Sequence, residues 1–223
     1  MKSLLILLTL VPVASTLAEH NALLPRPQQV QYGDGTLAVR GLSIHFSSTP
    51  SREDLFAAEQ LAAGLSAFSH HKIEIKQHKF SGGSIVLNRI GEAGALPSDN
   101  ERTGPDSRES YTLQITPKGV EIHARSSAGI FYGVQTLLQM VEGTEARAVL
   151  PVAGIKDWPA LAYRGTMIDF SEGELIRVSE AERQIDLMAR FKANQFYFYT
   201  EASIEFEGYD VVNPTGRYSR EDV

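Results

Sequence analysis

The stretch YRGTMIDFSEGELIRVSEAERQIDLMARFKANQFYFYT, residues 163–200, decides the fold that we expect for this chain. It predicts a strand over residues 164–170, then a loop and a helix, and a second strand over residues 195–200. Two parallel strands joined by a helix form the repeating unit of a (β/α)₈ barrel, whose chemistry lies where the strands end. A whole barrel needs roughly 250 residues. We therefore expect this chain, which stops at Val223, to hold only the start of one.

The helix of this stretch is predicted to begin at Ser179. Ser179 and Glu182 match the S-x-x-E capping box, in which the two side chains satisfy free backbone N–H groups. Apolar residues then recur at helical spacing and predict one buried face, formed by Ile185, Leu187, Met188 and Phe191.

Residues 19–150 predict a separate α+β accessory domain, a mixed sheet with two helices on one face. One helix begins after Ser51, with Asp54 as a short variant of the capping-box acid, and the other runs from about Ser127 to Val141. Residues 150–162 contain prolines and are predicted to link this domain to a truncated barrel domain, residues 151–223. Strands are expected at residues 29–32, 37–46, 72–76, 84–87, 111–115 and 120–124, the last two as a hairpin.

The first eighteen residues are predicted to be a secretory signal peptide. Lys2 gives the positive start, residues 4–14 form the apolar core, and residues 16–18 place small residues before a cleavage site. An uncleaved anchor is the alternative, although the apolar run is shorter than the about 20 residues of a membrane span. The chain has no cysteine, which excludes disulfides and thiolate sites. We therefore expect an exported protein, periplasmic or extracellular.

Composition excludes several classes of partner and cofactor. The net charge of -6 at pH 7, without a basic run, argues against nucleic acid and anionic membranes. The six histidines are dispersed without metal-ligand spacing, and no phosphate-binding glycine motif or G-x-S-x-G elbow occurs. We expect neither a metal nor a cofactor.

Polar residues gather where the two predicted strands of residues 163–200 end. A pair of carboxylates facing one cleft is what glycosidic cleavage needs, and aromatic rings suit the apolar faces of sugars. The plainer interpretation is that the carboxylates are solvated and that the aromatic residues pack in a core. The candidates are Asp169, Ser171, Glu172, Glu174, Tyr197, Tyr199, Glu201 and Glu205.

Four segments resemble glycoside hydrolase family 20, the β-N-acetylhexosaminidases. They are LLPRP at residues 23–27, AGIFYGVQTLLQ at 128–139, IKDWP at 155–159 followed by YRGTMID at 163–169, and IDLMARFKAN at 185–194. The resemblance implies an exo-acting enzyme for an amino-sugar glycan, in which the substrate's own acetamido oxygen is the nucleophile. The family's Asp-Glu catalytic pair follows the fourth barrel strand, so it would lie beyond Val223, and no catalytic residue is named on this chain.

Among the strand-end candidates we expect Asp169, Glu172, Tyr199 and Glu201 to bind the substrate. Glu172 stands where the family usually has an arginine, and Tyr197-Phe198-Tyr199 replaces its usual His-Trp-His. A carboxylate still accepts hydrogen bonds from sugar hydroxyls. Glu172 therefore keeps two alternatives open: a related barrel glycosidase, α-glucuronidase-like or O-GlcNAcase-like, and a sugar-binding protein without catalysis.

Overall fold

The computed structural model describes residues 20–76, 83–94, 97–169, 175–201, 203–209, 211 and 217–222. The predicted signal peptide, residues 1–18, lies outside the described residues, and so do Ser171, Glu172 and Glu174. The elements follow in the order β1 (Gln29–Ala38), β2 (Ser43–Phe46), α1 (Arg52–Ser69), β3 (Glu74–Ile75), β4 (Ser84–Arg89), β5 (Tyr111–Thr116), β6 (Gly119–Ala124), α2 (Ser127–Gln139), η1 (Glu145–Arg147), β7 (Val149–Asp157), β8 (Gly165–Asp169), α3 (Val178–Arg190) and β9 (Gln195–Tyr199).

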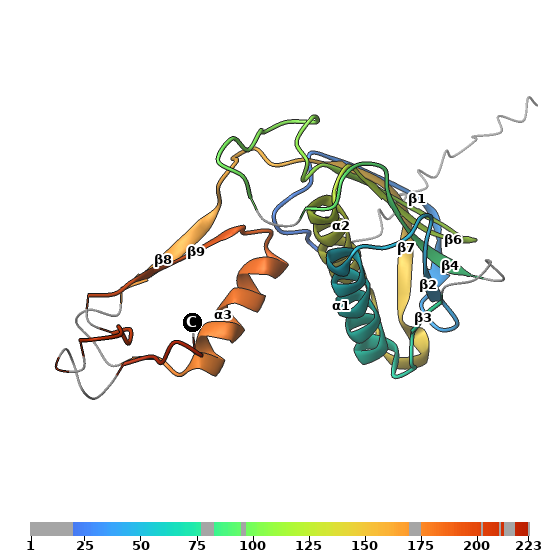
Figure 1. Ribbon diagram of the computed structural model, residues 1–223. Helices are drawn as coiled ribbons and strands as arrows, with labels where there is room; N and C mark the ends of the chain where they lie inside the picture. The colour runs from blue at the N-terminus through green and yellow to red at the C-terminus, as the bar shows by residue number, and fades with distance from the viewer. Residues whose placement is uncertain are drawn as a thin grey trace, which may run out of the picture.

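Seven strands form one mixed sheet in the order β1-β7-β5-β6-β4-β2-β3. The neighbouring pairs β1–β7, β7–β5 and β5–β6 are antiparallel. The pairs β6–β4, β4–β2 and β2–β3 are parallel. Helices α1 and α2 cover one face of this sheet (Figure 1). The predicted mixed sheet with two helices on one face is confirmed. We call this part, residues 20–158, the sheet unit.

The core of the sheet unit lies between that face and the two helices. Alternate residues along each strand point toward the helices, so the apolar positions of β4, β5 and β6 are buried every second residue. The largest fully buried side chains include Ile44, Leu61, Leu65, Ile85, Leu113, Ile122, Ile130 and Leu137.

Local sequence signals explain where the two helices of the sheet unit begin. Ser51 caps α1, and its side chain and that of Asp54 exchange hydrogen bonds with backbone N–H groups at 3.2 and 2.9 Å, which confirms the predicted capping box. The side chain of Ser126 caps α2 by accepting from the N–H groups of Ala128 and Gly129. The cap therefore lies one residue before the predicted start at Ser127.

The predicted linker over residues 150–162 is wrong for its first half, because residues 149–157 form strand β7 between β1 and β5. The linker was predicted because prolines, among them Pro151, are rare inside strands. Pro151 pairs with Thr36 beside an irregularity of β1, and the pairing of β7 with β5 reaches only to Ala153. A proline is tolerated there because no partner needs its missing N–H. The sheet unit thus extends past the predicted domain boundary at residue 150.

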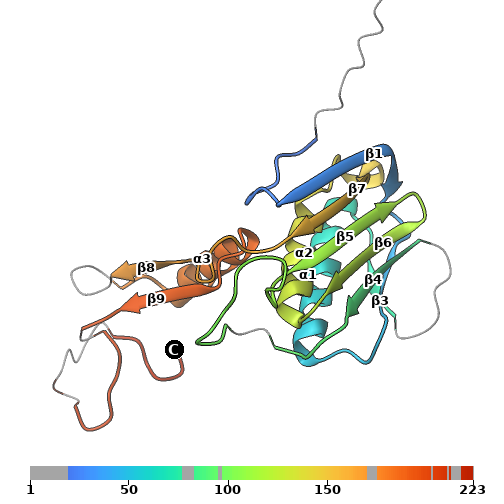
Figure 2. The ribbon, with the colours of Figure 1, turned by 90° about the horizontal axis from the view of Figure 1, so that it is seen from above.

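Strands β8 and β9 lie side by side and parallel, with α3 between them in the chain, as the sequence predicts. Together with α3 and the described residues that follow β9 they extend away from the sheet unit (Figures 1 and 2). Gly165 allows the close approach of the two strands, because a Cβ at this position would lie 2.0 Å from the carbonyl oxygen of Gln195. We call residues 163–199 the βαβ unit.

The predicted capping box of α3 is wrong. The helix begins at Val178 with Arg177 as its N-cap, and no side chain caps it. Ser179 already lies in the first turn, so its hydroxyl is not placed to cap. The acid that acts in this turn is Glu180, which accepts hydrogen bonds from Arg183 at 2.8 and 2.7 Å.

Candidate functional site

The ends of β8 and β9 bring two of the predicted site residues together. The register pairs Asp169 with Tyr199, so their side chains point to the same face of the two-stranded sheet. Glu201 follows two residues after Tyr199 and is exposed. Glu172, the fourth predicted residue, lies outside the described residues.

The same face carries further aromatic and apolar surface. Met167 pairs with Tyr197 one step before Asp169 and Tyr199, and both are exposed, at 61% and 52%. Tyr199 is 46% exposed. A carboxylate beside exposed tyrosine rings can accept hydrogen bonds from hydroxyl groups while the rings contact the apolar face of a sugar. This face can therefore bind a polyhydroxylated ligand, and we call it the strand-end site.

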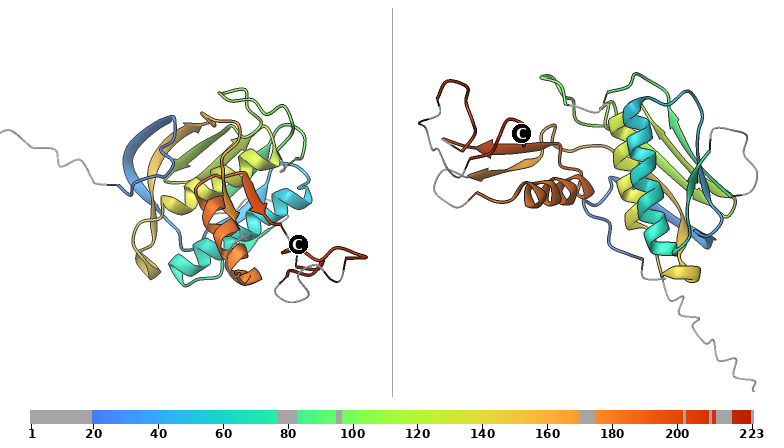
Figure 3. Two further views of the ribbon diagram at one scale, coloured as in Figure 1. Left: turned by 90° about the vertical axis from the view of Figure 1, so that its left-hand side faces the viewer. Right: turned by 60° about the horizontal axis from the view of Figure 1, so that its bottom comes forward.

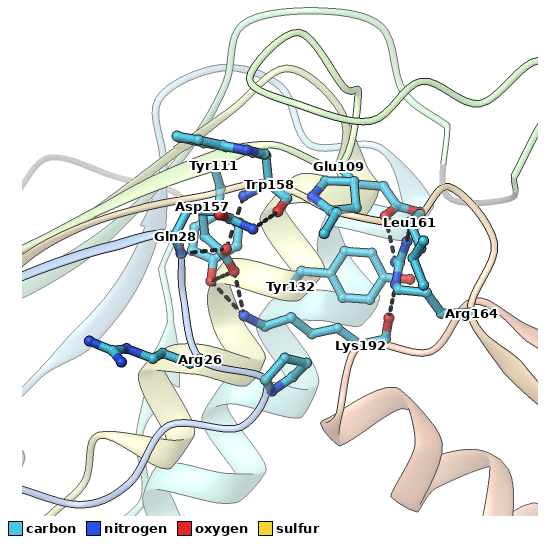
Figure 4. A pocket seen from close by; sticks show the side chains of 13 residues that line it. Arg26, Gln28, Glu109, Tyr111, Tyr132, Asp157, Trp158, Leu161, Arg164 and Lys192 are labelled. Carbon is cyan, nitrogen blue, oxygen red and sulfur yellow. Dashed lines mark hydrogen bonds and ion pairs between the residues drawn. The ribbon is translucent and has the colours of Figure 1, made fainter.

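A second cluster, which sequence reasoning missed, joins the βαβ unit to the sheet unit (Figure 4). Its first half is centred on Asp157 at the end of β7. One carboxylate oxygen of Asp157 accepts hydrogen bonds from Lys192 Nζ at 2.7 Å and from the Tyr111 hydroxyl at 2.8 Å. The other oxygen accepts from the backbone N–H groups of Gln28 and Trp158, at 3.2 and 3.0 Å. Every lone pair of this buried carboxylate is therefore occupied.

The second half of the cluster is centred on Glu109, which is 3% exposed. Its carboxylate accepts hydrogen bonds from Arg164 at 2.5 Å and from the amide of Asn194 at 2.9 Å. Arg164 also donates to the carbonyl oxygen of Lys192 at 2.8 Å, and its guanidinium lies 5.7 Å from the centre of the Tyr132 ring. We call Glu109, Tyr111, Asp157, Arg164, Lys192 and Asn194 the junction network.

Lys192 reaches the junction network from a strained backbone. It follows α3 with φ of 62°, in the left-handed region that normally favours glycine. Its N–H donates to Ala189, and the next N–H, of Ala193, donates to Met188, which is the Schellman pattern of a helix end. A glycine would relieve the backbone at this position but could not bind Asp157. The ion pair therefore explains why a lysine occupies it.

Burial shapes the protonation of the junction network. Burial lowers the pKa of the Lys192 ammonium, and the attraction of Asp157 opposes that shift. Burial and then the Asp157 charge raise the pKa of the Tyr111 hydroxyl well above its usual value. Burial and then the Glu109 charge raise the pKa of Tyr132 to about 12. Both hydroxyls therefore stay protonated at neutral pH, and Tyr111 acts as a donor to Asp157.

All members of the junction network except Asn194 line a cavity of about 210 Å³, which also touches Arg26, Trp158 and Leu161. In the described residues, no buried side-chain nitrogen or oxygen atom lacks a hydrogen-bond partner. The network also lies where β8 and β9 begin, at the opposite end from Asp169 and Tyr199. Its groups are satisfied by each other and by nearby backbone groups. We therefore assign it to holding the two units together and keep the strand-end site as the candidate for chemistry.

No group of histidine, aspartate or glutamate residues placed to hold a metal ion occurs within the described ranges. None of the helices seen there is long and apolar enough to cross a membrane.

The sequence marked residues of the junction network as part of the family resemblance, but it did not predict that they contact each other. Asp157 and Lys192 both lie in segments that carry the family resemblance, but the prolines of residues 150–162 placed Asp157 in a predicted linker, and no pattern gave Lys192 a partner. Their partners Glu109 and Tyr111 are distant in the chain, and no local pattern links them.

Comparisons with known proteins agree with the fold. The family model described as glycosyl hydrolase family 20, domain 2, matches residues 20–158. A beta-hexosaminidase of Porphyromonas gingivalis is 31% identical over 184 residues, which are 79% of this chain and 22% of that protein. A beta-N-acetylhexosaminidase of Cellulomonas fimi is 28% identical over 180 residues, covering 80% of this chain and 34% of its own.

The solved structure of an N-acetyl-beta-hexosaminidase of Streptomyces plicatus matches with a TM-score of 0.73 at 26% identity. The match covers 90% of this chain and 41% of that one, so the similarity includes the βαβ unit as well as the sheet unit. The chain spans between 22% and 41% of the length of these three relatives.

Proposed function

The chain belongs to glycosyl hydrolase family 20, and we propose that it forms the sheet domain and the first strands of the barrel in a β-N-acetylhexosaminidase. The single observation that carries this proposal is the parallel pair of β8 and β9, with a carboxylate and a tyrosine side by side where the strands end. In barrel enzymes the chemistry lies at that end of the strands, and conserved contacts at the other end serve stability. The strand-end site and the junction network occupy these two ends.

The proposed reaction removes a terminal N-acetylhexosamine with retention. The substrate's acetamido oxygen attacks the anomeric carbon as the glycosidic bond breaks, and the leaving oxygen takes a proton from a carboxylic acid. Water then opens the resulting oxazolinium ring from the face that the leaving group occupied. We place the acid and its aspartate partner outside this chain.

The proposed part of this chain in the reaction is to hold the sugar. Asp169 accepts hydrogen bonds from sugar hydroxyls, and the ring of Tyr199 contacts the sugar's apolar face. Glu172 and Glu201 follow the same strands and are proposed as further hydroxyl acceptors. No cofactor or metal enters this scheme. We propose export as the destination, on the signal pattern of residues 1–18.

Turnover of 4-nitrophenyl N-acetyl-β-glucosaminide tests the proposal. The protein expressed from its complete reading frame should hydrolyse this substrate, and Asp169→Asn should lower kcat/KM by about 10- to 100-fold, the value of a hydrogen bond to a charged group. Glu182→Gln, which removes an exposed carboxylate of α3, is the matched control and should leave kcat/KM unchanged. A complete protein that folds but never turns over amino-sugar glycosides would refute the proposal.

The 223-residue chain by itself should not hydrolyse the substrate. The described residues contain two strands of the proposed barrel, β8 and β9, and a closed barrel of eight is needed to surround a sugar. Turnover by the purified 223-residue chain would show that the catalytic groups lie within it.

A further inference from the structure

The face of the large sheet opposite α1 and α2 carries a groove that the proposed reaction does not use. No described helix covers this face (Figure 3). The groove has a volume of about 770 Å³ and runs between the segment that leads into β1 and strand β5. It is lined by Arg26, Pro27, Gln28, Gln29, Val30, Gln31, Thr112, Leu113, Gln114, Gly154, Ile155 and Lys156.

The strand register explains the shape of the groove. Gly154 of β7 pairs with Gln31 on one side and Gln114 on the other, so the centre of this row has no side chain. In the next row Lys156 lies between Gln29 and Thr112. Gly154 therefore forms the floor of a hollow whose walls are amides, a hydroxyl and an ammonium group.

The charge of the groove differs from that of the whole chain. Arg26 and Lys156 line it and are exposed, and within the described residues neither forms an ion pair. No carboxylate is among the lining residues, although the chain carries a net charge of -6. The carboxylate of this face next to Gln114 is Glu121, and it pairs with His123 at 2.8 Å. The groove is thus a cationic, amide-rich hollow on an acidic protein.

We propose that this groove binds an acidic glycan, a sugar chain that carries carboxylate groups. Glutamine side chains offer both donors and acceptors to hydroxyl and acetamido groups, and Arg26 and Lys156 complement the carboxylates. A neutral glycan would leave both cations without partners. The inference rests on the proposed function in one respect, which is that the ligand is a glycan. The groove itself is separate from the strand-end site, since the two lie on different units.

Titration of the ¹⁵N-labelled 223-residue chain with a hyaluronan tetrasaccharide tests the groove. This probe alternates glucuronate and N-acetylglucosamine, and chitotetraose is its neutral counterpart. We expect saturable amide shifts at Gln31, Thr112 and Gln114, at least tenfold tighter binding of the acidic probe, and weaker binding as salt rises. Equal binding of the two probes, or shifts spread evenly over the surface, would overturn the proposal.

Three variants assign the binding to the groove. Arg26→Gln with Lys156→Gln should weaken binding of the acidic probe at least tenfold. Gly154→Val should weaken it without any change in charge, since its Cβ would meet only the flexible end of Gln114, at 3.2 Å, so the strand tolerates it. Lys118→Gln, in the turn between β5 and β6, removes one exposed cation elsewhere and should change nothing. If Lys118→Gln weakens binding as much, the attraction is general and the groove is not the site.

The two proposals fail separately. Asp169→Asn should leave binding of the acidic probe to the groove unchanged. A complete protein that cleaves amino-sugar glycosides while its groove ignores the acidic probe overturns only the groove proposal. An inactive protein whose groove binds the probe overturns only the proposed reaction.

Discussion

The sheet unit and the βαβ unit are stabilised by different forces. In the sheet unit the apolar side chains of the central strands are buried against α1 and α2, with Ile44, Ile85 and Ile122 at 0% exposure. In the βαβ unit comparable side chains remain accessible: Met167 is 61% exposed, and Ile185 is 44% exposed. The sheet unit therefore has its own hydrophobic core, whereas the βαβ unit is attached mainly through the polar contacts of the junction network.

This difference shows how the βαβ unit can be oriented relative to the sheet unit. An apolar contact is non-directional, so it stabilises a range of docking angles. Charge-assisted hydrogen bonds require particular distances and directions. The junction network holds the residues that precede β8 and β9, and thereby sets the direction in which Asp169 and Tyr199 point.

The largest expected effect comes from breaking the junction network. Lys192→Met leaves the buried Asp157 carboxylate without its cation, and removal of one partner of a buried pair costs about 3–5 kcal/mol. Hydrogen exchange should therefore lose protection in β8 and β9 and keep it in β5 and β6. Lys118→Met, an exposed turn position, is the matched control.

Lys192→Gly sharpens that prediction. It removes the same ion pair but relieves a left-handed backbone that costs about 1–2 kcal/mol for a residue with a Cβ. It should therefore destabilise the βαβ unit less than Lys192→Met. Equal protection in both variants and in the original chain would show that the network does not hold the units together.

The next effect tests the strand pair inside the βαβ unit. Gly165→Ala places a Cβ against the Gln195 carbonyl oxygen, and overpacking of this kind costs about 1–3 kcal/mol or more. Gly154→Ala is the matched control in the sheet unit, because only a flexible glutamine side chain lies near its Cβ. Circular dichroism melts should show the loss for Gly165→Ala alone. If both variants lose similar stability, the loss comes from replacing any strand glycine, and not from the close approach of β8 and β9 at Gly165.

A smaller effect is expected from the cap of α2. Ser126→Ala removes the acceptor for the first N–H groups of the helix and should cost about 1 kcal/mol. The loss should appear as a lower midpoint of urea unfolding for the sheet unit. Ser126→Asp keeps a capping acceptor and should recover most of the lost stability. If both variants lose the same stability, the cause is the lost hydrogen bond from the Ser126 hydroxyl to the carbonyl oxygen of Arg108, and not the cap.

The smallest expected effect is a pH dependence of the stability of the sheet unit, caused by the carboxylate of Asp54. Burial by itself would raise the pKa of Asp54, but hydrogen bonds from Ser51, Ser127 and Arg89 outweigh it and hold that pKa below its usual value. A carboxylate with a lowered folded-state pKa adds stability above its unfolded pKa of about 3.9, and this stability is lost as the pH falls through the folded value.

The original chain should therefore melt at a higher temperature than Asp54→Asn. This difference in melting temperature should be largest at pH 7 and should shrink below about pH 4. Asp106→Asn, an exposed position, is the control. A difference that stays constant down to pH 2 would contradict the role of the Asp54 charge.

Much of the local structure followed from the sequence. The capping box at Ser51, the hairpin of β5 and β6, and the parallel pair of β8 and β9 were all predicted, because each rests on a pattern within a short window. One local prediction, the capping box of α3, was wrong, and the other failures occurred where a distant partner decides the outcome. Strand β7 was taken for a linker because its proline is acceptable only beside β1.

The sequence by itself determined the family, the alternation that buries one face of each strand, and the two residues, Asp169 and Tyr199, that meet at the strand ends. Only the tertiary structure decided the junction network and the groove. Glu109 and Asn194 are 85 residues apart, and Lys192 and Asp157 are 35 apart, yet each pair forms a direct hydrogen bond. Periodicity records which side of an element is apolar, but it carries no information on which distant charge meets another, because that depends on how the elements pack.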